Sequence, residues 1–260
     1  MDVRLPSWMA GEFVTRRQGT AAAIVRADFA GQFDRQRLIE AAGFPLRAVL
    51  QESDAALVGG REAARVIPAG PLGEAVVRPY RRGGWVEKIA HRRYILGARA
   101  FDELTLTHRL HGAGAPVPEC LAAVQASLRP AGYAACLITR RIPGSEAAGS
   151  VLREASPGEA KSTMEAIGRS VRRLHAAGGW HADLNANNLL VPVGWPGVPV
   201  IVIDLDRGRF YPGGVPRWRA TQNLRRLRRS LRKLGLTEAL AAWPALRKGY
   251  EPPPGPLPAA

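Results

Sequence analysis

The spacing of apolar and polar positions predicts short strands in the first half of the chain. Three apolar runs separated by turns, at 56–58, 63–67 and 75–80, have the length and composition of strands. Two more runs, at 121–124 and 133–139, follow a helical stretch. We therefore expect at least five strands before residue 140.

Three stretches have apolar residues at the three- and four-residue steps of amphipathic helices. The first spans Arg99–His111 and stops at Gly112. The second begins at Ser156, where a following proline and Glu159 complete a capping box. The third covers 217–233. Two of these three expected helices lie in the second half of the chain.

Two apolar runs, 189–191 and 200–203, flank a turn rich in Pro and Gly, which predicts a β-hairpin. Asp183 and Asn188 lie before the first run, and Asp204 follows the second. Because a hairpin brings these ends together, the three side chains should converge. Two carboxylates and an amide oxygen suit Mg²⁺, which combines few protein ligands with substrate phosphates. An Asn-rich loop beside an ordinary hairpin is the alternative interpretation.

The composition adds expectations about partners and compartment. The chain has 260 residues, 46% of them hydrophobic, which is enough for one domain or two lobes. Its net charge of +15 predicts anionic partners such as phosphates, nucleic acid or an acidic membrane. Cys120 and Cys136 lie among apolar residues and should be buried thiols. No signal peptide and no apolar run near the ~18 residues of a membrane span are evident, so we expect an intracellular protein that at most lies on a membrane.

The third helical stretch is strongly basic. Leucines mark its expected buried face, and no acidic residue interrupts its charge. A solvated basic face is one interpretation, and we favour an anion-docking face. The basic residues are Arg217, Arg219, Arg225, Arg226, Arg228, Arg229, Arg232 and Lys233.

The polar positions of the hairpin resemble the catalytic loop of the protein-kinase fold. There, a His-x-Asp triplet is followed by an Asn five residues after the Asp, and a later Asp leaves an apolar strand. Asp183, Asn188 and Asp204 fit this spacing, with Asp-Leu-Asp in place of Asp-Phe-Gly. The resemblance implies that Asp183 is the catalytic residue and that Asn188 and Asp204 bind Mg²⁺. We expect His181 to brace the loop rather than to act as ligand or base, and His175 to be a cation at a helix end.

The same resemblance gives roles to residues in the first half. Gly59 and Gly60 would fold over the nucleotide phosphates, although two glycines between strands also fit a plain turn. Glu103 would brace the strand cation that holds the α/β-phosphates, with a solvated Glu as the alternative. Arg140 to Gly144 fits a hinge between lobes.

Seven segments carry a resemblance to a narrower family. They read Arg78-x-Tyr-Arg-Arg-Gly-Gly, Arg99-Ala-Phe-x-Glu103, Ala115-Pro-Val-Pro118, Arg141-Ile-Pro-Gly144, Leu174-His-x-x-Gly-x-x-His-x-Asp-Leu-Asn, Ile203-Asp-Leu-Asp-Arg-Gly208 and Trp218-Arg-x-x-x-Asn-Leu-x-Arg-Leu-x-Arg-Ser-Leu-x-Lys233. These segments resemble the 3-deoxy-D-manno-octulosonic acid (Kdo) kinases, which are lipopolysaccharide-core kinases. The resemblance covers most of residues 56–234. The first and last segments distinguish this branch from kinases in general.

The resemblance implies an α+β, two-lobed protein-kinase-like fold. A small β-rich N-lobe would cover 56–140 and a mainly helical C-lobe 141–250. Residues 1–55 would form an N-terminal extension without an assigned role. Its residue pattern predicts a helix that Asp34 caps, that runs through Ala42 and that ends at Gly43. Residues 251–260 are a Pro-rich tail.

The resemblance also implies ATP-dependent phosphorylation of a Kdo hydroxyl on a lipid A precursor. The reaction would use Mg²⁺ at the cytoplasmic face of the inner membrane of a Gram-negative bacterium. The partners would be the Kdo-containing precursor and an anionic membrane surface, and no nucleic acid is expected. Arg207 or Arg209 would reach the Kdo carboxylate.

Two positions depart from the pattern of the family. Arg78 stands where the phosphate-binding Lys is expected, and an Arg is a planar fork rather than a point charge. Lys88 is a nearby substitute. Arg140 occupies a hinge position where an acidic residue would be more familiar. Neither departure affects the catalytic loop, so we expect an active enzyme.

Two alternatives stay open. A kinase-like enzyme with the same motifs could act on a heptose, another small molecule or a protein. A non-catalytic module of the same fold could use the basic helix to bind nucleic acid or anionic lipid.

Overall fold

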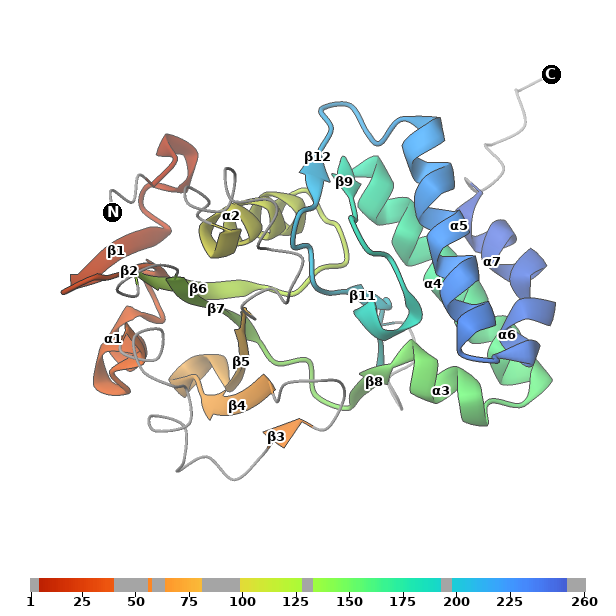
Figure 1. Cartoon of the computed structure of the whole chain (residues 1–260), viewed down its shortest axis with the longest axis horizontal. Coiled ribbons are helices and arrows are strands. Elements are labelled where there is room, and N and C mark those ends of the chain that lie inside the picture. Colours follow the sequence, from red (N-terminus) through yellow and green to blue (C-terminus); the bar gives the residue numbers. More distant parts are fainter. Residues whose placement is uncertain are drawn as a thin grey trace, which may run out of the picture. The chain divides into compact units, whose positions relative to one another are not determined.

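The structure, a computed structural model, describes residues 5–39, 56–57, 64–80, 99–127, 133–192 and 198–251. The chain forms two compact units. The first comprises Met1–Thr105 and Glu119–Arg141, and the second comprises Leu106–Pro118 and Ile142–Ala260. Helix α2 (Arg99–Gly112) contributes residues to both units (Figure 1).

The first unit is built on a seven-stranded antiparallel sheet with the order β1-β2-β6-β7-β5-β4-β3. Its strands are β1 (Phe13–Gln18), β2 (Ala21–Arg26), β3 (Ala56–Leu57), β4 (Ala64–Pro68), β5 (Glu74–Pro79), β6 (Cys120–Ser127) and β7 (Tyr133–Arg140). The five strands expected from apolar runs are all present. Strands β1 and β2 come from the segment interpreted as an extension, so part of that segment belongs to the sheet.

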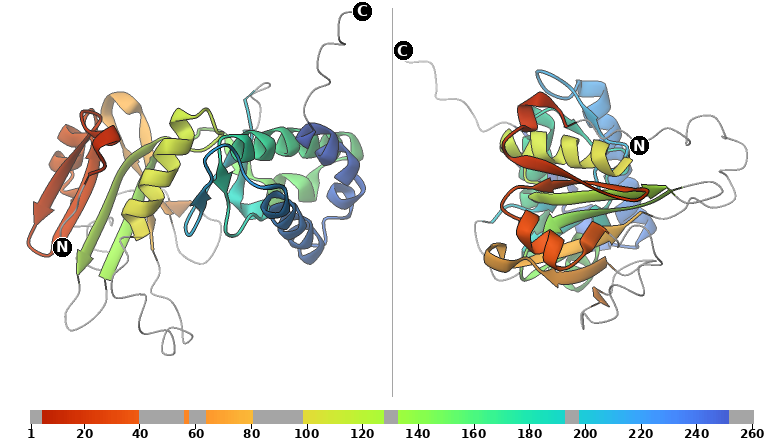
Figure 2. Two further views of the ribbon diagram at one scale, coloured as in Figure 1. Left: turned by 90° about the horizontal axis from the view of Figure 1, so that it is seen from above. Right: turned by 90° about the vertical axis from the view of Figure 1, so that its left-hand side faces the viewer.

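Both faces of the sheet are covered. Successive residues of a strand point to opposite faces and therefore pack in different apolar clusters. Helix α1 (Ala30–Arg35) lies on one face and α2 on the other (Figure 2). Val25 of β2 packs in one apolar cluster with Phe33 of α1. Its neighbour Ile24 packs in the second cluster with Leu104 of α2. Short 3₁₀ turns, η1 (Ser7–Met9) and η3 (Gly70–Leu72), complete the described part of this unit.

The expectation that Asp34 caps a helix start is wrong. Helix α1 begins four residues earlier and ends just after Asp34. The Asp34 carboxylate instead accepts a hydrogen bond from Arg16 of β1, 3.0 Å away. Asp34 therefore pairs with Arg16 of β1 and does not cap a helix.

The second unit is mainly helical. Its helices are α3 (Ala148–Glu154), α4 (Pro157–Ala176), α5 (Arg217–Lys233), α6 (Thr237–Ala241) and α7 (Trp243–Tyr250). Its short strands are β8 (Ser145–Ala147), β9 (Gly179–Trp180), β10 (Leu189–Pro192), β11 (Ile201–Val202) and β12 (Arg209–Phe210), with the 3₁₀ turn η5 (Ala186–Asn188). They form sheets of order β11-β10-β8 and β12-β9.

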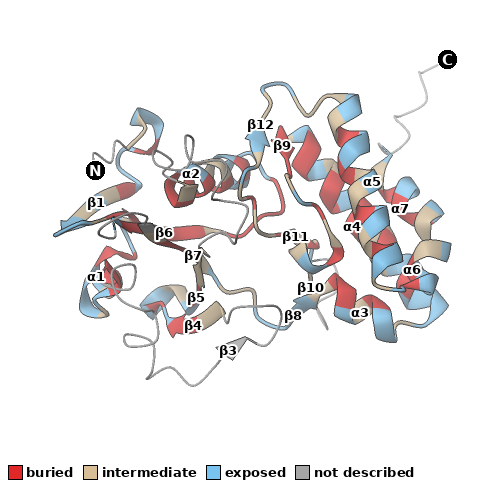
Figure 3. Cartoon of the chain, viewed as in Figure 1, coloured by how far each residue is buried: buried red, intermediate tan, exposed pale blue. Residues whose placement is uncertain are grey.

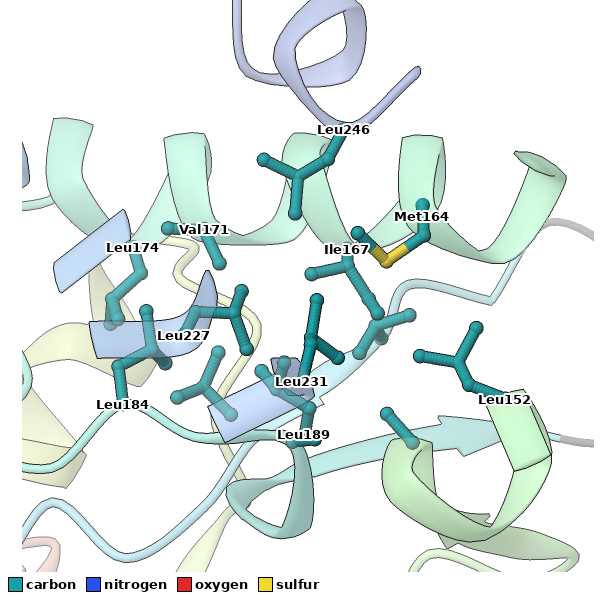
Figure 4. Packing of buried hydrophobic residues seen from close by; sticks show 14 of the residues in the cluster. Leu152, Met164, Ile167, Val171, Leu174, Leu184, Leu189, Leu227, Leu231 and Leu246 are labelled. Carbon is teal, nitrogen blue, oxygen red and sulfur yellow. The ribbon is translucent and has the colours of Figure 1, made fainter. Parts of the chain in front are cut away.

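Helix α4 is the centre of this unit. It starts with the expected capping box between Ser156 and Glu159. Its apolar face meets leucines of α5, α7 and the β9–β10 loop in one buried cluster (Figure 4). Gly168 lets α7 approach closely, since a Cβ there would lie 2.1 Å from the carbonyl oxygen of Leu246.

Helix α5 has the amphipathic form expected of the basic stretch. Ala220, Asn223, Leu227 and Leu231 are buried, and its other side is largely exposed (Figure 3). Both cysteines are buried free thiols, as expected. Within the described residues, no helix has the length and apolarity needed to cross a membrane.

Candidate functional site

The loop that carries Asp183 starts from the end of α4. After Ala176 the chain turns at Gly178, whose φ of +88° lies in the region that favours glycine. Residues Gly179 and Trp180 form β9, which pairs with β12. This pairing fixes the direction in which the chain enters His181.

His181 is fully buried and joins two parts of the site. The backbone N–H of Asp183 donates to its Nδ1 at 2.9 Å, and its Nε2 lies 2.9 Å from the carbonyl oxygen of Ile203. Because the Ile203 carbonyl can only accept, Nε2 carries a proton. Because Nδ1 accepts from the Asp183 N–H, it carries none, and the ring is therefore neutral. Burial lowers the pKa of His181, which also favours the neutral ring. His181 therefore braces the loop as expected, with neither nitrogen available as base or metal ligand.

Asn223 of α5 anchors the same residue from behind. This fully buried amide donates through Nδ2 to the His181 carbonyl oxygen at 2.6 Å. Its Oδ1 accepts from the His181 N–H at 3.2 Å and from His175 Nε2 at 3.0 Å. Asn223 has no role among the residues expected from the sequence. A polar residue on the buried face of an amphipathic helix was the available signal.

The interpretation of His175 as a cation at a helix end is wrong. His175 is 4% exposed, and Nδ1 bonds to the hydroxyl of Tyr250 at 2.8 Å. The pKa of His175 is lowered to about 4, because the effect of burial is larger than that of the hydrogen bond to Asn223, which raises the pKa. The ring is therefore neutral and serves as a packing and hydrogen-bonding group between α4, α5 and α7.

The loop after His181 presents Asp183 to solvent. The Asp183 side chain is exposed, and Asn185 Nδ2 donates to its Oδ2 at 3.1 Å. Its backbone oxygen accepts from Asn185 at 3.0 Å and from Asn188 Nδ2 at 2.9 Å. Leu184 and Ala186, in contrast, are fully buried in the apolar cluster. The alternation holds the backbone rigidly while leaving the carboxylate accessible.

The expected hairpin is present and places Asp204 beside Asn188. Strands β10 and β11 pair antiparallel, and the Ile203 N–H donates to the Asn188 carbonyl oxygen at 3.0 Å. Asp204 follows with a φ of +62°, which is rare for a residue with a side chain. Such a conformation costs about 1–3 kcal/mol and is typical of functional sites. Hydrogen bonds to both backbone groups of Ile203 hold the chain in this turn.

The donor set fits Mg²⁺. The Asn188 amide group uses its Nδ2 on the Asp183 backbone, which leaves its Oδ1 without a hydrogen-bond partner among the described residues. Asp204 adds a carboxylate. Across the described part of the chain, no cluster of three or more His, Cys, Asp or Glu side chains could hold a metal alone. Two hard oxygen ligands are what a site completed by substrate phosphates requires.

In the first unit, the structure brings Arg78 and Glu103 together. Arg78 Nη2 on β5 lies 2.7 and 2.6 Å from the two carboxylate oxygens of Glu103 on α2. Glu103 is 3% exposed, and the hydroxyl of Tyr80 donates to the same carboxylate. The alternative of a solvated Glu103 is therefore wrong. The pair has the positions, one on a strand and one on a helix, of the kinase ion pair that holds phosphates.

Gly59, Gly60 and Lys88 lie outside the described residues. Arg140, in the expected hinge, pairs with Glu119 at 3.3 Å. Arg207 and Arg209 are exposed, Arg207 beside Asp206 and Arg209 in the strand that pairs with Trp180.

Comparison with known proteins identifies the family. Residues 50–250 match the lipopolysaccharide kinase (Kdo/WaaP) family. The chain belongs to this family. It is therefore an enzyme, a phosphotransferase with an alcohol acceptor, and the alternative of a non-catalytic module is set aside.

Individual members of the Kdo/WaaP family are similar over most of this chain. A 3-deoxy-D-manno-octulosonic acid kinase of Xanthomonas axonopodis pv. citri is 38% identical, covering 78% of this chain and 80% of its own. The protein of the same name from Stenotrophomonas maltophilia is 36% identical, covering 84% and 88%. Among solved structures, WaaP in complex with acyl carrier protein is similar with a TM-score of 0.50 and 21% identity, covering 80% and 82%. That likeness supports the two-lobed protein-kinase-like fold.

Proposed function

We propose that this member of the Kdo/WaaP family transfers the γ-phosphoryl group of ATP to a hydroxyl of Kdo on a lipid A precursor. The observation that carries the proposal is the similarity to proteins named Kdo kinases over more than three quarters of the chain. The rigid loop with an accessible Asp183 supports a transfer reaction at this site.

Asp183 is the catalytic residue in this proposal. Its carboxylate orients the acceptor hydroxyl and accepts its proton as the oxygen attacks the phosphorus. His181 holds the Asp183 backbone through a buried hydrogen bond, and Asn223 holds His181. The loop is thus arranged before the substrate arrives, which lowers the cost of positioning.

The remaining residues bind the phosphates of ATP. Asn188 and Asp204 would hold Mg²⁺, which offsets negative charge on the transferred group. Arg78, which is paired with Glu103, or Lys88 would hold the α/β-phosphates, and Gly59 and Gly60 would fold over the phosphates. Arg207 or Arg209 would bind the Kdo carboxylate.

We further propose that the protein works at the cytoplasmic face of the inner membrane of a Gram-negative bacterium. Helix α5 supports a surface location, since Arg225, Arg228 and Arg232 are exposed at three- and four-residue spacing. Trp218 on the same helix is 57% exposed, and tryptophan favours the membrane–water interface. A basic face of this kind is attracted to anionic lipid.

The test is mass spectrometry of a Kdo-containing lipid A precursor after incubation with the protein and Mg-ATP. We expect one added phosphate with the wild-type protein and none with Asp183→Asn. A heptosylated acceptor assayed in parallel examines the alternative sugar. Phosphate found on the heptose and not on Kdo would overturn the proposal while leaving a kinase.

A further inference from the structure

An open groove runs along α5 beside the catalytic loop. Its volume is about 640 Å³, and it is lined by Trp180, Gln222 and the six arginines from Arg219 to Arg232. All of these residues belong to the second unit. We call this feature the arginine groove.

The charge of the arginine groove is uncompensated. None of its lining residues is acidic. None of the six arginines forms an ion pair with a carboxylate in the parts of the chain that the structure describes. Six guanidinium groups around one hollow repel each other, so an anion that entered would be attracted strongly.

The inner wall of the groove is ordered by aromatic stacking. Arg219 lies 4.0 Å from the ring centre of Trp218 and 5.1 Å from that of Trp180, and Arg226 lies 5.8 Å from the latter. Arg219 and Arg226 are half-buried, whereas the other four arginines are exposed. Stacking of this kind fixes the plane of a guanidinium and leaves its edge for hydrogen bonds.

Two donors of the groove lack acceptors. The Nε atom of Arg219 and the Nε1 atom of Trp180 are buried, and neither has a hydrogen-bond partner in the described residues. A buried donor without an acceptor is costly. Phosphate oxygens are acceptors with the charge and the fork geometry that arginine binds best.

The groove is joined to the catalytic loop. Trp180 directly precedes His181, and Arg226 Nη1 lies 3.5 Å from the His181 carbonyl oxygen. His181 in turn binds the backbone of Asp183. The proposed metal ligands, Asn188 and Asp204, do not line the groove.

We infer that the arginine groove binds a phosphate group of the lipid-linked acceptor and so positions the sugar hydroxyl at Asp183. The inference rests on the proposed function. The groove is far larger than one carboxylate needs, and it accommodates a phosphorylated sugar. Its half-buried pair, Arg219 and Arg226, acts at short range, whereas the exposed Arg225, Arg228 and Arg232 line both this groove and the proposed membrane face.

The test compares Arg219→Gln with Arg217→Gln, a change of the same charge on the same helix outside this groove. Arg229→Gln, an exposed lining residue, is a second variant that does not disturb the tryptophan stack. Each protein is assayed in neutral detergent micelles with the Kdo-containing lipid A precursor and with the same acceptor after phosphatase treatment. Equilibrium binding of both acceptors is measured separately, without ATP.

We expect Arg219→Gln to raise KM and the dissociation constant for the phosphorylated acceptor by about tenfold or more, as loss of a hydrogen bond to a charged group does. Arg229→Gln should act in the same direction, and KM for ATP should stay unchanged. The treated acceptor should bind wild type and variants alike, and Arg217→Gln should resemble wild type.

Equal losses with both acceptors, or none with either, would overturn the inference. Phosphate-dependent binding without phosphoryl transfer would overturn the proposed function alone. Tighter binding of an acidic protein or of RNA than of the phosphorylated acceptor, lost in Arg219→Gln, would assign the groove to another partner.

Discussion

Replacing Asn223 by leucine removes three buried hydrogen bonds while keeping a side chain of similar size. The amide contacts the His181 N–H, the His181 carbonyl oxygen and His175 Nε2 at 2.6–3.2 Å. Leucine fills the space, so the change chiefly leaves polar groups without partners. Arg226, 3.5 Å from the carbonyl oxygen, can replace one bond. Two unsatisfied buried groups at about 1–3 kcal/mol each predict a loss of about 3 kcal/mol in the free energy of unfolding.

The assay is equilibrium unfolding in urea with linear extrapolation to water. Gln222→Leu, an exposed neighbour on the same helix, is the matched control and should change stability by less than about 0.5 kcal/mol. Turnover should fall about 10²-fold in Asn223→Leu, because a small displacement of the loop misplaces Asp183. A loss of stability below about 1 kcal/mol, or normal turnover, would refute the bracing argument.

The same network predicts a loss of stability in acid. The pKa of His175 falls from 6.5 to about 4 on folding, so the unfolded chain binds the proton first. Stability should therefore decrease as pH falls from about 6.5 to about 4, by up to roughly 3 kcal/mol from this residue. His175→Gln cannot titrate and should show a flatter profile in that window. Identical profiles for the two proteins would show that folding does not lower the pKa of His175.

The remaining predictions concern the reaction and the surface. Asp183→Asn should lower turnover by about 10²–10⁴-fold with an unchanged melting temperature, and near-normal turnover would contradict its role. Asp204→Ala should lose the rise in melting temperature that Mg-ATP gives the wild type, and an equal rise would argue against metal binding there. Reversing Arg225, Arg228 and Arg232 to Glu should weaken binding to anionic vesicles at low salt without substrate, at about 1 kcal/mol per cation. Equal vesicle binding would place the membrane contact elsewhere.

Elements with local signals could be predicted from the sequence. The capping box between Ser156 and Glu159, only three residues apart, predicts the start of α4. The spacing of the leucines predicts the buried face of α5. The hairpin follows from two apolar runs and a turn, and it carries Asn188 and Asp204 to the same place. The sequence alone therefore predicts that Asn188 and Asp204 lie close together.

Features that depend on distant contacts were not predicted. Strand β2 is buried on both faces, so it lacks the alternation that marks a half-exposed strand. His175 is neutral because burial lowers its pKa, and its hydrogen-bond partner Tyr250 lies 75 residues away. Asn223 reaches His181 across 42 residues. In each case the decisive partner comes from another element, and spacing along one segment does not reveal it.

The left-handed backbone of Asp204 also depends on contacts with residues distant in the sequence. A left-handed aspartate is unstable alone, and it persists only where the neighbouring backbone is over-determined. Ile203 provides this, because its N–H is bound by Asn188 and its carbonyl by the neutral ring of His181. Since the backbone of His181 is held in turn by Asn223, the conformation of one proposed metal ligand depends on α5. Substitutions in the buried face of this helix should therefore impair the site even when they leave every proposed ligand in place.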